Sequence, residues 1–390
     1  MNIFGRPPAF TYKKDHLMVD RVALSKLAKQ YRTPLYVYSG STIRERYRAF
    51  DLAFKDIPHT VCYSVKANSN LSLLKFLAKL GSGFDVVSGG ELERVLRASK
   101  KAASKVVFSG VGKTAEEMDF ALKAGILLFN VESAGELDLL VSRASKQRRK
   151  ARIAFRVNPD VFAETHPYIS TGLREHKFGV AMNDVAVLYL HAGQQKHLDV
   201  AGVSVHIGSQ ITSVEPFAAA MARVAQLVRA LIVQGHDIRY VDAGGGLGIP
   251  YKDEDVLKTD FVAKSGNYAQ ALAAALNGLK VHLLLEPGRS IVGPAGALLT
   301  RVLYTKQNSK KRFVIVDAAM NDLLRPSLYS AYHEIVPVDL CAAALDEMSE
   351  CDVFDVVGPV CETGDFFARD RKSTRLNSSH LKLSRMPSSA

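Results

Sequence analysis

The chain has 390 residues, of which 47% are hydrophobic and 23% are charged, and its mean hydropathy is +0.02. Because no stretch is evidently long and apolar enough to span a membrane, we expect a soluble globular protein that is long enough for two domains. Its formal charge of +12 suits anionic small molecules as well as nucleic acids, because four of the positive charges lie in an acid-free segment after Arg371. The four cysteines form no CxxC pair and have no histidine at ligand spacing, which argues against a structural zinc site or a disulfide framework, and we expect no metal site.

The N-terminal region predicts a lead-in to a larger domain. Residues Met1–Phe10 include two prolines and no apolar core, so we expect neither a signal peptide nor a transit peptide, and therefore a cytoplasmic location. The spacing of apolar residues predicts a helix over Val22–Tyr31, which Pro34 ends before a strand at Leu35–Tyr38.

From Thr60 onward, short apolar runs alternate with longer stretches of helical period. Eight such runs are predicted as strands: Val61–Val65, Phe84–Val87, Val106–Ser109, Leu127–Val131, Ile153–Val157, Val203–Ile207, Tyr240–Ala243 and Val281–Leu285. Thr114, Ser133 and Asn183 precede helical runs as N-cap candidates. Eight strands alternating with helices over about 230 residues predict a (β/α)8 barrel, which we place at residues 35–290.

Lys66 follows the first of these strands, within Tyr63-Ser64-Val65-Lys66-Ala67-Asn68. We expect its apolar neighbours to lower the pKa of the ammonium group, which makes the amine available as a nucleophile toward a carbonyl such as an aldehyde cofactor. The alternative is a strand-end lysine that extends to solvent, and the hexapeptide alone favours this alternative.

Polar residues also follow the other strands, where the active site of a barrel forms. They are Asp85, Ser109, Glu132, Arg156 with Asn158, His206 with Ser209, Asp242 and Glu286 with Arg289. Any single member is also explained by an ion pair that closes the barrel mouth, and His206 by a core histidine. As a set they predict a pocket.

Two glycine-containing turns complete this set. Gly244-Gly245-Gly246-Leu247-Gly248 follows the seventh strand, where the backbone amides of a barrel often bind phosphate. The run lacks the lysine and the serine or threonine of a P-loop. Glu286-Pro287-Gly288-Arg289 ends the eighth strand and places an acid and a cation on either side of a turn, which is also compatible with an internal salt bridge.

Nine motifs in this order carry a family resemblance: YSVKAN, FDVVSGGEL, RVNP, STGLREHKFG, HIGSQ, DAGGGLGIPY, EPGRSIVGPAG, RPSLYSAYHEI and CETGD. They resemble those of the fold-type III pyridoxal-phosphate decarboxylases, and specifically of the diaminopimelate decarboxylases, from about residue 5 to 370. The ornithine and arginine decarboxylases share the lysine, the glycine run and EPGR. RPSLYSAYHEI and CETGD favour diaminopimelate.

The resemblance implies roles at pyridoxal 5'-phosphate. Lys66 would bond covalently to its aldehyde, Glu286 would face the pyridine nitrogen, and His206 would stack on the ring. Ser209, Gly245, Gly246, Gly288 and Arg289 would hold the phosphate. Asp85, Arg156 and Pro287 complete the cofactor-binding set.

The resemblance also implies how substrate binds. Arg289, Arg325 and Tyr329 would bind the distal carboxylate of meso-diaminopimelate, and Glu362 its distal ammonium. Cys361 would donate the proton that gives L-lysine. Because Cys361 and Glu362 reach the partner's active site in this family, a homodimer with shared sites is implied.

After Ser290 the pattern changes to strands, including Leu298–Tyr304, Phe313–Val316 and Val353–Val357, which with residues 1–34 resemble the family's β-sandwich domain up to residue 371. Residues 372–390 show no strand pattern and are predicted to be a disordered tail foreign to the family, joined to a truncated domain. The competing functions are an ornithine or arginine decarboxylase and a non-catalytic homologue that only binds the cofactor.

Overall fold

The computed structural model describes residues 9–161, 177–251, 260–309, 311–340, 353–372 and 380–384. They fall into two compact units, which are a barrel unit of Tyr47–Gly248 and Asp260–Ser290 and a sheet unit that contains the remaining described residues. The barrel unit begins at Tyr47 and not at Leu35, where the sequence predicted its start. The reason is that Leu35–Tyr38 (β4) pairs antiparallel with a strand of the sheet unit.

The barrel unit is built on eight parallel strands. They are β5 (His59–Ser64), β6 (Gly83–Val86), β7 (Val106–Phe108), β8 (Leu128–Val131), β9 (Ala151–Asn158), β11 (Leu198–Val205), β12 (Tyr240–Asp242) and β13 (His282–Leu285). The sheet closes because β13 pairs with β5 and β8 pairs with β9, all in parallel. A two-residue strand, β10 (Val180–Ala181), adds to β9. All eight predicted strands are confirmed, and with them the barrel.

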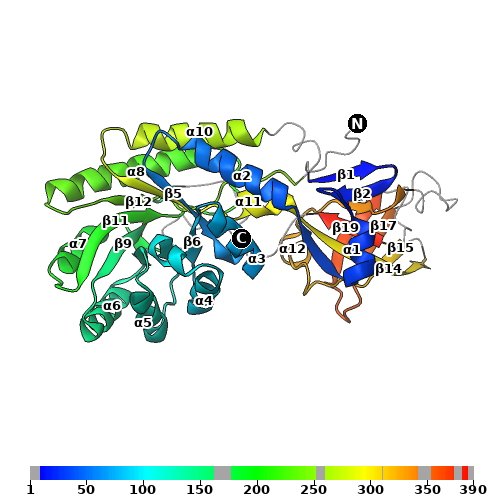
Figure 1. Cartoon of the computed structure of the whole chain (residues 1–390), viewed down its shortest axis with the longest axis horizontal. Helices are drawn as coiled ribbons and strands as arrows, with labels where there is room; N and C mark the ends of the chain where they lie inside the picture. The colour runs from blue at the N-terminus through cyan, green and yellow to red at the C-terminus, as the bar shows by residue number, and fades with distance from the viewer. Residues whose placement is uncertain are drawn as a thin grey trace. The chain divides into compact units, whose positions relative to one another are not determined.

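Helices lie outside these strands (Figure 1). The helices that alternate with the barrel strands along the chain are α3 (Leu71–Lys79), α4 (Gly89–Ala98), α5 (Ala115–Ala124), α6 (Ala134–Gln147), α7 (Val185–Gly193), α8 (Glu215–Val233) and α10 (Phe261–Ala275). The chain enters the barrel through α2 (Gly40–Ala53), and α11 (Arg289–Val292) follows β13. Short 3-10 turns cover Val65–Ala67, Lys100–Lys105 and Gly293–Ala295.

Side-chain caps explain where two of these helices begin. Thr114 and Glu117 form a reciprocal capping box on α5, and the Ser133 hydroxyl accepts a hydrogen bond from the Glu136 amide on α6, as predicted. The prediction for Asn183 is wrong, because Asp184 occupies the N-cap position of α7 without a side-chain cap bond.

Helix α8 corrects the expectation that no segment approaches a membrane span. Its 19 residues are long and apolar enough to span a membrane by length and composition alone. In the structure, however, α8 packs as a barrel helix and buries an apolar stripe that includes Phe217, Val224 and Leu231. The hydropathy of α8 is therefore explained by packing against the barrel.

The sheet unit contains two β-sheets. The smaller is antiparallel and consists of β1 (Phe10–Lys13), β2 (His16–Val19) and β3 (Val22–Ala23). The larger is mixed and consists of β4, β14 (Gly296–Asn308), β15 (Lys311–Val316), β16 (Ile335–Pro337), β17 (Val353–Val357), β18 (Phe366–Lys372) and β19 (His380–Ser384). The predicted strands after Ser290 are confirmed. The predicted helix at Val22 begins at Leu24 (α1, Leu24–Tyr31), because Val22–Ala23 pairs with β2.

Two apolar clusters hold the sheet unit together. One contains Val314, Val356 and Phe367, and the other contains Phe10, Leu17 and Leu299. The tail contributes a strand to this unit, since β19 pairs antiparallel with both β14 and β16. The expectation that the whole of residues 372–390 is disordered is therefore wrong for His380–Ser384. The rest of that segment after Lys372 lies outside the described residues.

Candidate active site

Lys66 lines a cavity at the carboxyl end of the barrel strands. The cavity is lined by Ser64, Lys66, His206, Ser209, Gln210, Gly246, Leu247, Gly288, Arg289 and Ser290. Ser64 ends β5, and the other lining residues come from segments that follow β5, β11, β12 and β13, as the polar residues after the strands predicted. Lys66 itself lies in the 3-10 turn Val65–Ala67 rather than in strand conformation, and its side chain is 32% exposed. The lysine is therefore held by the barrel and accessible from the cavity.

The pKa of Lys66 is shifted in the opposite direction from the one that the sequence predicted. Its Nζ lies 3.2 Å from Asp85 Oδ2, which also accepts a hydrogen bond of 2.5 Å from the Ser64 hydroxyl. Burial lowers the pKa of Lys66, but the negative charges of Asp85 and Glu286 more than offset that effect, so the pKa is raised above its ordinary value. The prediction of a lowered pKa is wrong because it considered only the neighbours of Lys66 along the chain, and not the charges of Asp85 and Glu286 that the barrel brings close to it.

Glu286 forms a coupled acid pair with Asp242. The Oδ2 of Asp242 accepts hydrogen bonds from Asn130 Nδ2 at 2.6 Å and Ser204 Oγ at 3.0 Å, and its Oδ1 accepts one from the Gly244 amide at 2.9 Å. These donors favour the charged form of Asp242. Burial and the charge of Asp242 raise the pKa of Glu286 well above its ordinary value. Burial raises the pKa of Asp242 as well, so the two carboxyls, which are joined by a hydrogen bond, hold a proton more tightly than exposed carboxyls do.

His206 is neutral in this environment. Burial, together with the positive charges of Arg156 and Lys66, lowers the pKa of His206 well below its ordinary value. Its Nδ1 accepts a hydrogen bond of 3.1 Å from the Gly245 amide, which places the ring proton on Nε2. The imidazole at the cavity wall is therefore an uncharged ring of fixed tautomer.

The glycine run after β12 passes close to neighbouring backbone. A Cβ on Gly245 would lie 2.2 Å from the Glu286 carbonyl oxygen, and one on Gly246 would lie 2.1 Å from that of Gly208. Gly246 also has φ of +105°, which L side chains rarely adopt. These two positions accept only glycine, and the backbone of Gly246 forms part of the cavity wall as a result.

Arg156 is fixed by a buried carboxylate. Its Nη1 donates to Glu132 Oε1 at 3.1 Å, and its guanidinium lies 4.8 Å from the ring centre of Phe178. Glu132 also accepts hydrogen bonds from the amides of Gly110 and Gly179. The charge of Arg156 is thereby held where it keeps His206 neutral.

Comparison with known proteins decides the family. The family model described as pyridoxal-dependent decarboxylase, pyridoxal binding domain, matches residues 40–293. A diaminopimelate decarboxylase of Pseudomonas aeruginosa is 50% identical over 362 residues, which cover 93% of this chain and 84% of the relative. The chain belongs to the diaminopimelate decarboxylase family.

Solved structures agree with this membership. Diaminopimelate decarboxylase from Helicobacter pylori, complexed with L-lysine, has a TM-score of 0.84 at 43% identity over 93% of this chain and 88% of that one. The enzyme from M. jannaschii, in co-complex with L-lysine, has a TM-score of 0.87 at 36% identity over 98% of this chain and 88% of that one. Both the barrel and the sheet unit are therefore family features.

The cavity has the chemistry that the family's cofactor requires. It presents a primary amine on Lys66, backbone amides around Gly246 and a hydroxyl on Ser209. The Oδ1 atom of Asp85 is buried and has no hydrogen-bond partner among the described residues. The protein therefore leaves a buried polar atom beside Lys66 without a partner. These residues fit pyridoxal phosphate.

The family residues of the sheet unit lie on a short helix and a loop. Arg325 and Tyr329 begin and end α12 (Arg325–Tyr329), and Arg325 is buried. Cys361 and Glu362 lie in an exposed loop, where the Gly364 amide donates to Glu362 Oε1 at 3.3 Å. The Ser327 hydroxyl donates to the Gly364 carbonyl at 2.5 Å and so ties this loop to α12.

Asp365 fixes the same loop, although sequence reasoning gave it no role. Its carboxylate accepts hydrogen bonds from the amides of Met320 at 2.6 Å and Val360 at 2.8 Å. The two segments that carry the expected substrate residues are therefore held together inside the sheet unit.

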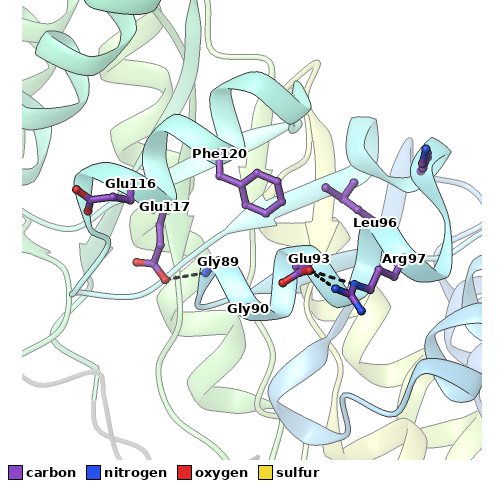
Figure 2. Close-up of a pocket in the computed structure, with 9 residues that line it drawn as sticks. Gly89, Gly90, Glu93, Leu96, Arg97, Glu116, Glu117 and Phe120 are labelled. Carbon is purple, nitrogen blue, oxygen red and sulfur yellow. Dashed lines mark hydrogen bonds and ion pairs between the residues drawn. The ribbon is translucent and has the colours of Figure 1, made fainter.

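A second cavity lies between α4 and α5 (Figure 2). Leu96 and Phe120 form its apolar wall, the Gly89 amide donates to Glu117 at 2.7 Å, and Glu93 pairs with Arg97. None of the predicted site residues lines this cavity.

Sequence reasoning also missed residues that support the site. Asn130 and Ser204 hold Asp242, and Ser64 shares the carboxylate of Asp85 with Lys66. A polar residue inside a buried apolar run, such as Asn130 in Leu128–Val131, is a signal that could have found them. Gln210, which ends the motif HIGSQ, accepts a hydrogen bond from Arg289 at 3.3 Å.

Proposed function

We propose that the chain catalyses the decarboxylation of meso-2,6-diaminopimelate to L-lysine and carbon dioxide, the last step of lysine biosynthesis, with pyridoxal 5'-phosphate at Lys66. The observation that carries the proposal is the cavity in which Lys66, His206, Ser209 and the glycine backbone at Gly246 converge in a member of this family.

Pyridoxal phosphate, when bound, supplies an electron sink for the charge that remains when carbon dioxide leaves. Lys66 would hold the cofactor covalently, and the hydroxyl of Ser209, the backbone around Gly245 and Gly246, and the turn of Gly288 and Arg289 would hold its phosphate. Pro287 supports that turn, because its carbonyl accepts a hydrogen bond from the Ser64 amide.

Glu286 would hold a proton at the cofactor's pyridine nitrogen. Burial and the charge of Asp242 raise the pKa of its carboxyl, and Asp242 fixes its position through a carboxylate that Asn130 and Ser204 orient. The neutral ring of His206 would cover one face of the cofactor, and burial, with the positive charge of Arg156, lowers the pKa of that ring. Asp85 would stay beside Lys66 as its ionic partner.

Substrate recognition would come from charged residues of both signs. We propose that Arg289, Arg325 and Tyr329 bind the distal carboxylate and that Glu362 binds the distal ammonium. Cys361 would give a proton to the carbon that has lost carbon dioxide. We propose a cytoplasmic homodimer with shared sites, and the exposure of Cys361 and Glu362 supports their action on a partner's substrate.

One experiment separates this function from its alternatives. The holoenzyme is assayed for carbon dioxide release from meso-diaminopimelate, ornithine and arginine, beside the visible absorption of the bound cofactor. We expect release from meso-diaminopimelate alone. Faster release from ornithine or arginine would identify the other decarboxylase type, and bound cofactor without release from any substrate would identify a non-catalytic homologue.

A further inference from the structure

Arg325 is held by two aromatic residues of the sheet unit, Tyr251 and His333, which lie in the motifs DAGGGLGIPY and RPSLYSAYHEI but have no role assigned above. Its Nη1 lies 3.2 Å from His333 Nε2, and its guanidinium carbon lies 4.5 Å from the ring centre of Tyr251. The rings of Tyr251 and His333 meet edge to face, with their centres 5.7 Å apart. The three side chains form one packed cluster.

The contact between Arg325 and His333 fixes the state of the imidazole. A guanidinium is always protonated and can only donate, so His333 Nε2 must be the acceptor. The ring proton of an uncharged His333 therefore lies on Nδ1. His333 is fully buried, and its carbonyl accepts a hydrogen bond of 2.6 Å from Arg371 Nη2 on β18, which anchors the segment to the large sheet.

These contacts restrict the orientation of the guanidinium. One Nη donates to His333, and the ring of Tyr251 lies against the guanidinium. An arginine binds a carboxylate best when two of its N–H groups meet the two oxygens in one plane, so the orientation of its fork decides the strength of the bond. A cluster that fixes the fork in advance reduces the ordering that binding requires.

We propose that His333 and Tyr251 are positioning residues that orient Arg325 toward the substrate's distal carboxylate and thereby set the preference for carboxylate-bearing diamines over plain diamines. This inference rests on the proposed role of Arg325. It assigns His333 no contact with substrate or cofactor.

The test uses the holoenzymes of wild type, His333→Leu, His333→Gln and Tyr332→Phe. Leucine removes the acceptor, glutamine retains one, and Tyr332→Phe is the neighbouring control because it keeps the ring on which Arg371 stacks. The measurements are kcat and KM for meso-diaminopimelate and the inhibition constants of L-lysine and 1,5-diaminopentane, which lacks the carboxylate.

We expect His333→Leu to raise KM and the inhibition constant of L-lysine about tenfold, which is about 1.4 kcal/mol. The inhibition constant of 1,5-diaminopentane and kcat should change little, and glutamine should recover part of the loss. Because His333 is fully buried, Tyr251→Leu provides a second variant, for which the same loss of selectivity is expected if His333→Leu does not fold.

An Arg325→Ala variant separates the two levels of the proposal. If it leaves L-lysine inhibition unchanged, the proposed role of Arg325 is wrong. If it weakens inhibition by L-lysine and the variants of His333 and Tyr251 do not, the positioning role is wrong. A parallel loss of kcat and of both inhibitors' affinities in His333→Leu would also overturn it, since that is the result of a structural role alone.

Discussion

Replacement of Glu286 by Gln tests the acid pair at the centre of the site. Glutamine has the shape of a protonated glutamic acid and can still donate a hydrogen bond to Asp242, so the surrounding contacts of Asn130 and Ser204 are retained. It cannot carry a negative charge. The variant therefore removes the charge that would hold a proton on the cofactor and leaves the fold of the site in place.

The magnitude follows from one hydrogen bond between charged groups, which contributes about 1.5–3 kcal/mol. If that bond acts in the rate-limiting step, kcat should fall about 10- to 150-fold. KM should change much less, because Lys66, Arg325 and the phosphate contacts are untouched. A rise in KM at constant kcat would refute the proposed role of Glu286.

The same variant predicts a change in the pH dependence of stability. The pKa of Glu286 is raised in the folded chain, so its contribution to stability is fully present below its unfolded pKa of about 4.3 and is lost as the pH rises through the folded value. Relative to wild type, cofactor-free Glu286→Gln should therefore become more stable as the pH rises above about 4.3, by up to about 1.4 kcal/mol per pH unit.

Urea unfolding of the cofactor-free chains from pH 5 to 8 measures this difference. Ser109→Ala is the matched control, since it removes the 3.3 Å contact of a neutral hydroxyl with Glu286 and leaves both carboxylates in place. It should keep the wild-type slope. An unchanged slope in Glu286→Gln would show that Glu286 is not the group that holds the extra proton.

Four further predictions follow from the site. Lys66→Ala should abolish turnover and the borohydride-reducible bond to the cofactor, and normal turnover would exclude Lys66 as the attachment point. Asp85→Asn should lower the pKa of Lys66, so cofactor capture measured by stopped-flow absorbance should shift to lower pH; a shift to higher pH would contradict the role of Asp85. Gly246→Ala should weaken equilibrium binding of inorganic phosphate and of the cofactor at least tenfold, because its Cβ would lie 2.1 Å from the Gly208 carbonyl oxygen, and unchanged binding would contradict the cradle. Mixed Lys66→Ala and Cys361→Ala chains should recover activity if sites are shared, and no recovery after verified subunit exchange would count against sharing.

The barrel was predictable because its strands are short, apolar and buried on both faces. Runs such as Val106–Phe108 and Leu128–Val131 are buried throughout, and loops and helices of regular length separate them. Parallel strands bring their carboxyl ends to one face, so the residues after each strand could be grouped without knowledge of the pairing. This reasoning placed Lys66, Asp85 and His206 in one site.

The sheet unit was less predictable because its pairings join distant segments. β4 pairs with β14, more than 250 residues later, and β19 pairs with β14 and β16 although its surrounding sequence is polar. Strand formation here depends on a partner that completes a ladder of hydrogen bonds, and local pattern does not contain that partner. The same reason explains why the cluster of Tyr251, Arg325 and His333 could not be foreseen.

Lys66 shows most clearly what local sequence omits. Its neighbours along the chain are apolar and argue for a lowered pKa, whereas its neighbours in space are Asp85 and Glu286 and raise the pKa instead. A charged lysine beside an ionised carboxylate has a proton acceptor at 3.2 Å, so its nucleophilic form is reached by moving a proton within the site rather than by a permanently low pKa. The carboxylates that stabilise the charged lysine come from other strands. The reactivity of this amine is therefore a property of the closed barrel, and no stretch of sequence around Lys66 contains it.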